Sequence, residues 1–124
     1  MIHVDTSALI AALTGRRAAI PVLRSFISDG IRLGISTPVL YEWLRGPRLD
    51  EELAAQELLL PRHAVFPFGL QEAVLAAGIY RRMKRPRQRE LDLAIAACAI
   101  SSGASLWTLN REDFADIPGL SLAP

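Results

Sequence analysis

The sequence has little of several features that would place a protein at once. It has one cysteine in 124 residues, so no disulfide can form within the chain, which fits a reducing compartment. No stretch approaches the roughly 20 apolar residues of a membrane span. No secretory leader is recognisable, because Asp5 interrupts the first apolar run. These absences argue against a disulfide scaffold and a membrane-spanning helix, and we expect a cytoplasmic protein with no membrane partner.

The chain also carries little net charge. The net charge of +1 is too small to indicate a nucleic-acid binder, so only the distribution of the charges can do so. Apolar residues make up 51% of the chain and charged residues 22%, which is an ordinary globular balance. A chain of this length buries roughly two thirds of the surface that it exposes when unfolded. We therefore expect a single domain over residues 1–124.

What the chain does contain is an alternation of short strand-like runs with longer helical ones. This order predicts an α/β fold with a parallel sheet covered by helices on both faces, and such sheets bind ligands beyond the carboxyl ends of their strands. The predicted strands are Ile2–Asp5, Leu33–Ser36, Ala64–Phe66, Leu106–Thr108 and a weak Leu120–Leu122. The predicted helices are Ser7–Leu13, Ala18–Ser28, Pro38–Arg45, Glu51–Leu60, Leu70–Met83 and Glu90–Ser101.

Asp5 stands where the first strand gives way to the first helix, in the opening MIHVDTSALI. One interpretation is structural, because a short polar residue at this point is a natural N-cap. Thr6 or Ser7 can cap the helix equally well, which leaves Asp5 free for a functional role. Its place at the carboxyl end of a parallel strand favours that second interpretation.

Two more acids lie in apolar surroundings. Glu42, in STPVLYEWLRG, has large apolar neighbours on most sides, and an ionised group in such company needs a partner or a solvated cleft. The alternative is an exposed glutamate that happens to have large neighbours. Asp92 begins a run that is apolar all round, which indicates a buried helix. Its place in the first turn of that helix suits an anion.

Asn110 and Asp113 follow the strand-like run LWT, again at a carboxyl end. They also have a structural alternative, in which Asn110 orders the loop as an Asx turn and Asp113 begins a short helical turn. Taken with Asp5, Glu42 and Asp92, they would bring carboxylates together that repel one another without a cation. Hard oxygen ligands of this kind suit Mg²⁺ or Mn²⁺. Such a site supports attack by water on a phosphodiester.

Four segments together resemble the PIN-domain family, and within it the VapC-type toxins of bacterial toxin–antitoxin pairs. The resemblance spans nearly the whole chain and implies a three-layer α/β/α nuclease with a central parallel sheet. It implies a Mg²⁺-dependent endoribonuclease, with Mn²⁺ as the other candidate ion, that hydrolyses RNA phosphodiester bonds with metal-activated water. It also implies a homodimer and a cognate antitoxin as partners. The segments are DTSALI, STPVLYEWLRG, DLAIAACAISSGASLWTLNREDF and IPGLSL.

The resemblance also assigns roles residue by residue. Asp5 and Asp92 match the principal metal ligands of the family, and Glu42 matches its second acid, which contacts the metal directly or through water. Asn110 falls where many PIN domains carry a fourth acid, so a second metal would be held weakly unless Asp113 compensates. The implied catalytic residues are Asp5, Glu42, Asp92 and Asp113, with Thr6, Ser7, Thr108 and Asn110 supporting them or contacting substrate.

A basic run, RRMKRPRQRE, precedes the Asp92 helix. Such a run is usually a solvated face, but here it lies next to the proposed acids in sequence, which favours capture of an RNA backbone. An acidic antitoxin segment is a second candidate for the same charges. The residues expected to contact the RNA backbone are Arg82, Lys84, Arg85, Arg87 and Arg89.

Alternatives to the ribonuclease remain open. A PIN-like module that binds RNA or protein without catalysis is supported by the neutral Asn110. A metal-dependent DNA nuclease is a rival, since the metal chemistry does not distinguish the two sugars. A phosphatase with Asp5 as nucleophile is disfavoured, because it needs a second acid where Ser7 stands.

Overall fold

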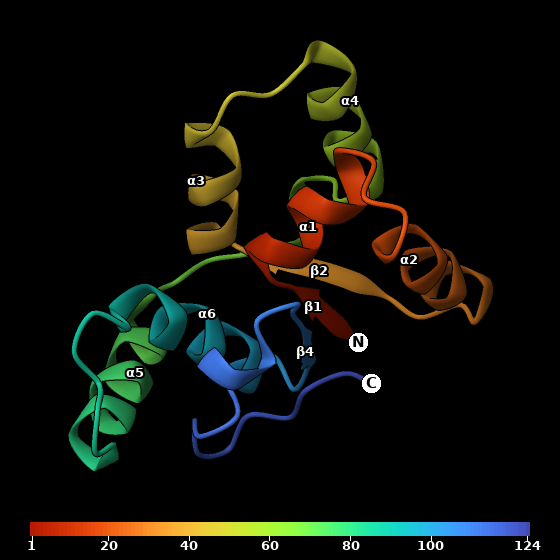
Figure 1. Ribbon diagram of the computed structural model, residues 1–124. Helices are drawn as coiled ribbons and strands as arrows, with labels where there is room; N and C mark the ends of the chain where they lie inside the picture. Colours follow the sequence, from red (N-terminus) through yellow and green to blue (C-terminus); the bar gives the residue numbers. More distant parts are fainter.

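A four-stranded parallel sheet lies at the centre of the computed structural model, which describes all of residues 1–124 (Figure 1). The strand order is β3-β2-β1-β4, so the first strand occupies an inner position. Helices connect each strand to the next and bring the chain back to the edge at which the strands begin. This confirms the parallel α/β prediction. The strands are β1 (Ile2–Val4), β2 (Leu33–Ser36), β3 (Val65–Phe66) and β4 (Ser105–Trp107).

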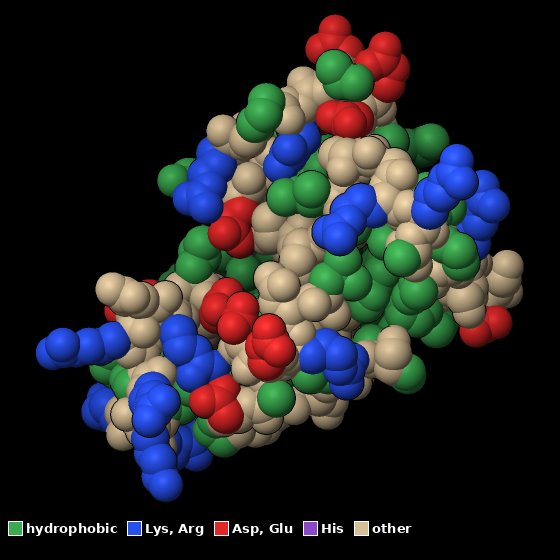
Figure 2. All heavy atoms as spheres, viewed as in Figure 1, with side chains coloured by type: hydrophobic (Ala, Val, Ile, Leu, Met, Phe, Trp, Pro, Cys, Tyr) green, Lys and Arg blue, Asp and Glu red, His purple; other side chains and the backbone are tan.

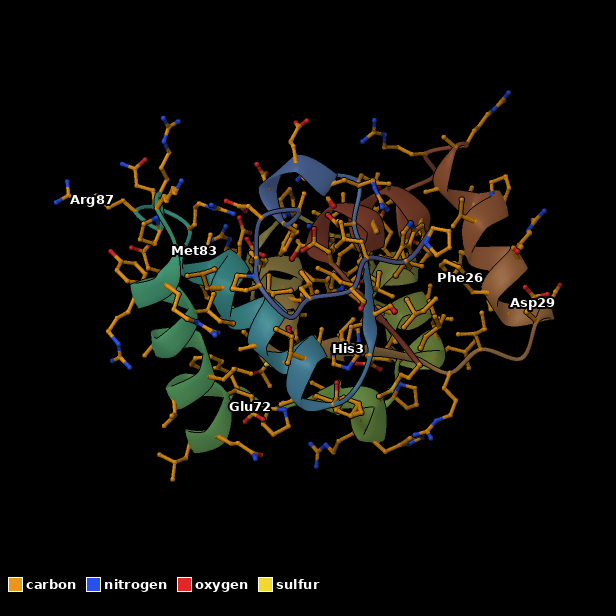
Figure 3. The ribbon with its side chains drawn as sticks, turned by 90° about the horizontal axis from the view of Figure 1, so that it is seen from below. His3, Phe26, Asp29, Glu72, Met83 and Arg87 are labelled. Atoms are coloured by element: carbon orange, nitrogen blue, oxygen red, sulfur yellow. The ribbon has the colours of Figure 1, made fainter.

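Helices cover both faces of the sheet. α5 packs against α6 on one side, while α1 packs against α2 and α3 (Figures 1 and 3). Residues 93–99 of α6 are all buried, as its apolar sequence predicts. None of the helices combines the length and the apolar character that crossing a bilayer requires. The helices are α1 (Thr6–Leu13), α2 (Ala19–Ser28), α3 (Thr37–Arg45), α4 (Asp50–Leu59), α5 (Leu70–Arg82) and α6 (Glu90–Ser101).

The strand boundaries differ from the prediction at the two points that matter for function. β1 ends at Val4, because the carbonyl of Asp5 already accepts the first helical hydrogen bond, from the N–H of Leu9 at 2.9 Å. β4 ends at Trp107, because the hydroxyl of Thr108 accepts the N–H of Asn110 at 3.0 Å and turns the chain. Both polar residues therefore lie just outside the strands to which the prediction assigned them.

The two remaining strand predictions were too long. Ala64 belongs to a 3₁₀ turn, Arg62–Ala64, and only Val65–Phe66 pairs with the sheet. The weak strand Leu120–Leu122 is reduced to a single parallel bridge between Leu106 and Leu122.

His3 is a buried titratable side chain in β1. It is 1% exposed, its Nε2 lies 3.1 Å from the hydroxyl of Ser102, and its ring lies against that of Phe66 at a centroid distance of 4.8 Å. Burial lowers the pKa of His3 to about 4. The folded protein therefore holds His3 neutral at a pH where the unfolded chain protonates it.

We expect acidification to destabilise the protein through His3. Between pH values near the ordinary His pKa and about 4 the unfolded state binds more protons, so stability is full above this window and falls as pH drops through it. The loss attributable to His3 is about 2–3 kcal/mol. Thermal melts at a series of pH values measure it, and His3→Gln should flatten the slope. Equal slopes for the two proteins would contradict this account.

Candidate active site

Asp5 occupies the N-cap position of α1, but its side chain makes no capping hydrogen bond. Instead its Oδ2 accepts hydrogen bonds from the hydroxyls of Ser7, at 2.9 Å, and Thr108, at 2.7 Å. The residue is 4% exposed. The capping interpretation of Asp5 is therefore wrong, and the carboxylate is held in place by side chains from α1 and from the end of β4.

The two hydroxyls that hold Asp5 also fix the loop after β4. The hydroxyl of Ser7 accepts the N–H of Leu109 at 3.0 Å, and that of Thr108 accepts the N–H of Asn110 at 3.0 Å. All of the hydrogen bonds to the Asp5 carboxylate go to Oδ2. Its other oxygen, Oδ1, is thereby left available to a ligand.

Glu42 reaches the same region from α3. Its Oε1 accepts a hydrogen bond of 2.5 Å from the hydroxyl of Thr6, the residue after Asp5, and its Oε2 lies 3.4 Å from Nη2 of Arg45. Ser36 caps α3, because its hydroxyl accepts the N–H of Val39 at 3.5 Å. Thr6 therefore couples the second acid to the segment that carries the first.

The expectation that α3 is apolar on most sides around Glu42 is wrong in one respect. Trp43 is fully buried, whereas Tyr41 is 57% exposed and Leu44 is also open to solvent. Only one face of α3 packs into the core, so Glu42 lies at the border between core and solvent. Its side chain retains 19% of its surface, which leaves it accessible to a ligand.

The pKa of Asp92 is affected by the charges of the other acids. Its pKa is raised to about 6, first by burial and then by the negative charges of Asp5, Asp113 and Glu42, while Arg89 opposes the rise. Three acids from distant parts of the sequence therefore act on Asp92 at the carboxyl edge of the sheet. Figure 2 shows acidic side chains gathered on this face of the molecule, beside a group of basic ones.

Asn110 and Asp113 are both exposed in the loop after β4. The Asx-turn alternative is wrong for Asn110, whose side chain makes no capping hydrogen bond to the 3₁₀ turn that follows it. Asp113 ends that turn, Arg111–Asp113, rather than beginning it. Of the two, Asp113 acts electrostatically on Asp92, so it is the better candidate to complete the acidic site.

Arg89 has a role that sequence reasoning missed. Its guanidinium donates to both carboxylate oxygens of Asp116, at 2.9 and 2.6 Å, and to the carbonyl of Asp113, at 2.7 Å. It thereby ties the start of α6 to the loop that carries Asp113. No local pattern signals this pairing, because the partners are far apart in sequence. Arg89 is thus engaged within the protein, unlike the other four predicted RNA contacts.

Those four, Arg82, Lys84, Arg85 and Arg87, are exposed and belong to neither of the two ion pairs in the structure. Arg82 ends α5, and the others lie in the loop to α6. Figure 3 shows Arg87 extending away from the body of the protein. Their side chains are therefore free to meet an anionic partner.

The donor chemistry of the site fits a divalent cation. The charges of three carboxylates from separate elements act on Asp92, and the cations near this set are Arg45 beside Glu42 and Arg89, whose charge acts on Asp92. Hard oxygen ligands and an excess of negative charge suit Mg²⁺ or Mn²⁺. No three acid, histidine or cysteine side chains stand close enough together to enclose an ion, so binding requires side-chain rotation.

By its fold and by the acids at the carboxyl edge of its sheet, the chain is a parallel α/β protein with a cluster of carboxylates at the ends of its strands. The chain belongs to the PIN domain family, whose model matches residues 2–120. It is 32% identical over 120 residues to ribonuclease VapC19 of Mycobacterium tuberculosis, with 94% of each chain covered. It is 34% identical over 128 residues to ribonuclease VapC1 of Rickettsia felis, with 96% of this chain and 92% of the relative covered.

Solved structures share the fold of this chain. A DNA-bound VapBC from Salmonella typhimurium superposes with a TM-score of 0.78 at 25% identity, over 98% of this chain and 96% of that one. The resemblance drawn from the sequence motifs is therefore confirmed, and with it the three-layer α/β/α architecture.

Proposed function

We propose that this protein is a metal-dependent endoribonuclease that acts in the cytoplasm as the toxin of a VapBC-type toxin–antitoxin pair. Two relatives with the name ribonuclease VapC, each aligned over more than nine tenths of this chain, support the substrate class. The solved VapBC complex supports a cognate antitoxin as partner. Mg²⁺ is the proposed cofactor, with Mn²⁺ as the other candidate.

The observation that carries the proposal is the effect of three distant acids on Asp92. Asp92 has its pKa raised by Asp5, Asp113 and Glu42, so negative charges accumulate where a parallel sheet binds its ligands. Such an arrangement costs stability unless a cation relieves it. A site that keeps this cost is best explained by a function that needs the cation.

In this proposal the acids bind the ion and the neighbouring hydroxyl residues position the acids. Asp5 and Asp92 would hold the ion, with Glu42 and Asp113 completing the set of acids. Ser7 and Thr108 fix the Asp5 carboxylate through its Oδ2, and Thr6 fixes Glu42. A bound divalent cation supplies charge stabilisation to the phosphate and lowers the pKa of water.

The second candidate is a PIN-like module that binds RNA without cutting it. The exposed, neutral Asn110 and the open arrangement of the acids favour it. Calorimetric titration with Mg²⁺ separates the two functions, because a degenerate site takes up no ion in a carboxylate-dependent manner. A homodimer is proposed for either function.

The direct test is cleavage of labelled RNA by the purified chain in Mg²⁺. We expect the wild type to cut RNA in preference to DNA of the same sequence, and Glu42→Gln to slow cleavage about 10- to 100-fold, the effect typical of groups that tune a metal site. Glu51→Gln, an exposed acid in the first turn of α4, is the matched control and should cut normally. An inactive wild type would contradict the proposal, and preferential cutting of DNA would reassign the substrate.

A further inference from the structure

Tyr80 lies between two hollows on the surface beside α5. One is a groove of about 350 Å³ with largely apolar walls, among them Phe68, Ala77 and Leu93. The other, of about 340 Å³, is formed by Tyr80 with Lys84, Arg85 and Arg87. Tyr80 contributes to both. An aromatic side chain thus joins an apolar hollow to a cationic one.

Both aromatic side chains of this surface remain open to solvent, at 36% exposed for Tyr80 and 38% for Phe68. The neighbouring cations have no acidic partner, since the two ion pairs of the structure involve Arg45 and Arg89. Figure 2 shows Lys and Arg side chains crowded over this end of the molecule, around the end of α5 and the loop to α6. The surface therefore offers stacking and positive charge together.

The loop that presents the cations is held in shape. Arg89 donates to the carbonyls of Arg85, at 3.2 Å through its side chain, and Pro86, at 3.2 Å through its N–H. Gln88 has a φ of 64°, the only left-handed backbone at a residue other than glycine. Such conformations persist where the surroundings impose them, and they are frequent at binding sites.

We propose that this surface, which we call the Tyr80 site, binds a single-stranded segment of the RNA. An unpaired base stacks on Tyr80 at the mouth of the apolar groove, and the adjoining phosphates pair with Lys84, Arg85 and Arg87. This inference rests on RNA being the substrate, as proposed above, and adds a second point of contact away from the acids.

The arrangement favours RNA over an acidic protein segment. A polyanion of either kind satisfies the cations, but a nucleic acid carries a flat base beside every phosphate, whereas a run of acidic residues carries no ring. Proteins that bind single strands combine a basic groove with aromatic stacking in this way. Leu93 in the groove directly follows Asp92 of the acidic site in α6, so the groove borders the helix that carries this acid.

The test is fluorescence anisotropy with a labelled single-stranded RNA of about 12 nucleotides, in EDTA so that no cleavage occurs. We expect Tyr80→Ala to raise the Kd roughly 5- to 150-fold and Tyr80→Phe to leave it unchanged, because the ring provides the stacking. Binding to the same sequence as a duplex should be insensitive to Tyr80, since its bases are already stacked. Lys84→Gln should lower the salt dependence of binding by about one ion, with exposed Arg24→Gln in α2 as its control.

Equal affinity of Tyr80→Ala and wild type for the single strand would overturn the proposal. So would a glutamate-rich peptide that displaces RNA as well as unlabelled RNA does, or a Tyr80→Ala defect that appears only as loss of a dimer in gel filtration. The outcome is separable from that of the proposed function. Tyr80-dependent binding by a wild type that fails to cut RNA in Mg²⁺ would support this site and reject the ribonuclease.

Discussion

Asp5→Asn is expected to reduce RNA cleavage about a thousandfold while leaving the protein folded. Asparagine keeps the shape of the side chain and an oxygen that can accept from Ser7 and Thr108, so the local hydrogen bonds survive. What is lost is the negative charge aimed at the ion. Several kcal/mol of charge stabilisation correspond to about three powers of ten in rate. Initial rates with labelled RNA at saturating Mg²⁺ measure the effect.

Two controls separate a lost site from a damaged fold. Asp29→Asn changes an exposed acid at the end of α2, on the opposite side of the molecule from α5 (Figure 3), and should cut normally. EDTA should lower the rate of RNA cleavage by the wild type to that of Asp5→Asn. If Asp5→Asn cuts RNA as fast as the wild type, the assignment of the acidic site is wrong, whatever the family.

The order of elements and the edge that carries the acids were predictable because they follow from local rules. Apolar runs separated by turn residues locate the strands and helices, and parallel strands end at one edge. The burial of α6 follows from a sequence without a polar face. Asp5 and Asp92 could therefore be placed near each other without any knowledge of the side chains.

The contacts that orient these acids were not predictable, because each joins residues that only the tertiary fold brings together. Thr108 reaches Asp5 from the other end of the chain, and Thr6 and Glu42 are 36 residues apart in sequence. Arg89 was expected to face RNA, yet Asp116 holds it. A sequence pattern indicates which residues meet at an edge, but not which hydroxyl or guanidinium takes which partner.

Asp92→Asn is expected to stabilise the protein in the absence of metal while abolishing its response to Mg²⁺. The folded state raises the pKa of Asp92 from 3.8 to about 6, so it binds more protons than the unfolded state between these values. Stability therefore falls as the pH rises through this window and stays low above it. At about pH 8, removal of the charge should add about 1–2 kcal/mol, reduced from the full shift because the side chain is partly exposed.

Thermal melts in EDTA measure this gain, which corresponds to about 3–8 °C in Tm for a chain of this size. The difference between variant and wild type should vanish near pH 4, where Asp92 is protonated. His3 titrates over the same range with the opposite sign, but it is present in both proteins and cancels in the difference. Asp29→Asn should show no such difference at any pH.

Thermal melts with added Mg²⁺ show whether the stability gain of Asp92→Asn comes from the loss of a metal ligand. An ion that binds only the folded state raises the Tm of the wild type in proportion to the logarithm of its concentration. Asp92→Asn has lost both a ligand and the repulsion that the ion relieves, so its Tm should not respond. A variant that is less stable than the wild type in EDTA would show that Asp92 serves the fold. A variant that Mg²⁺ stabilises as much as the wild type would show that the ion does not depend on Asp92, and the assignment of Asp92 as a metal ligand would be wrong.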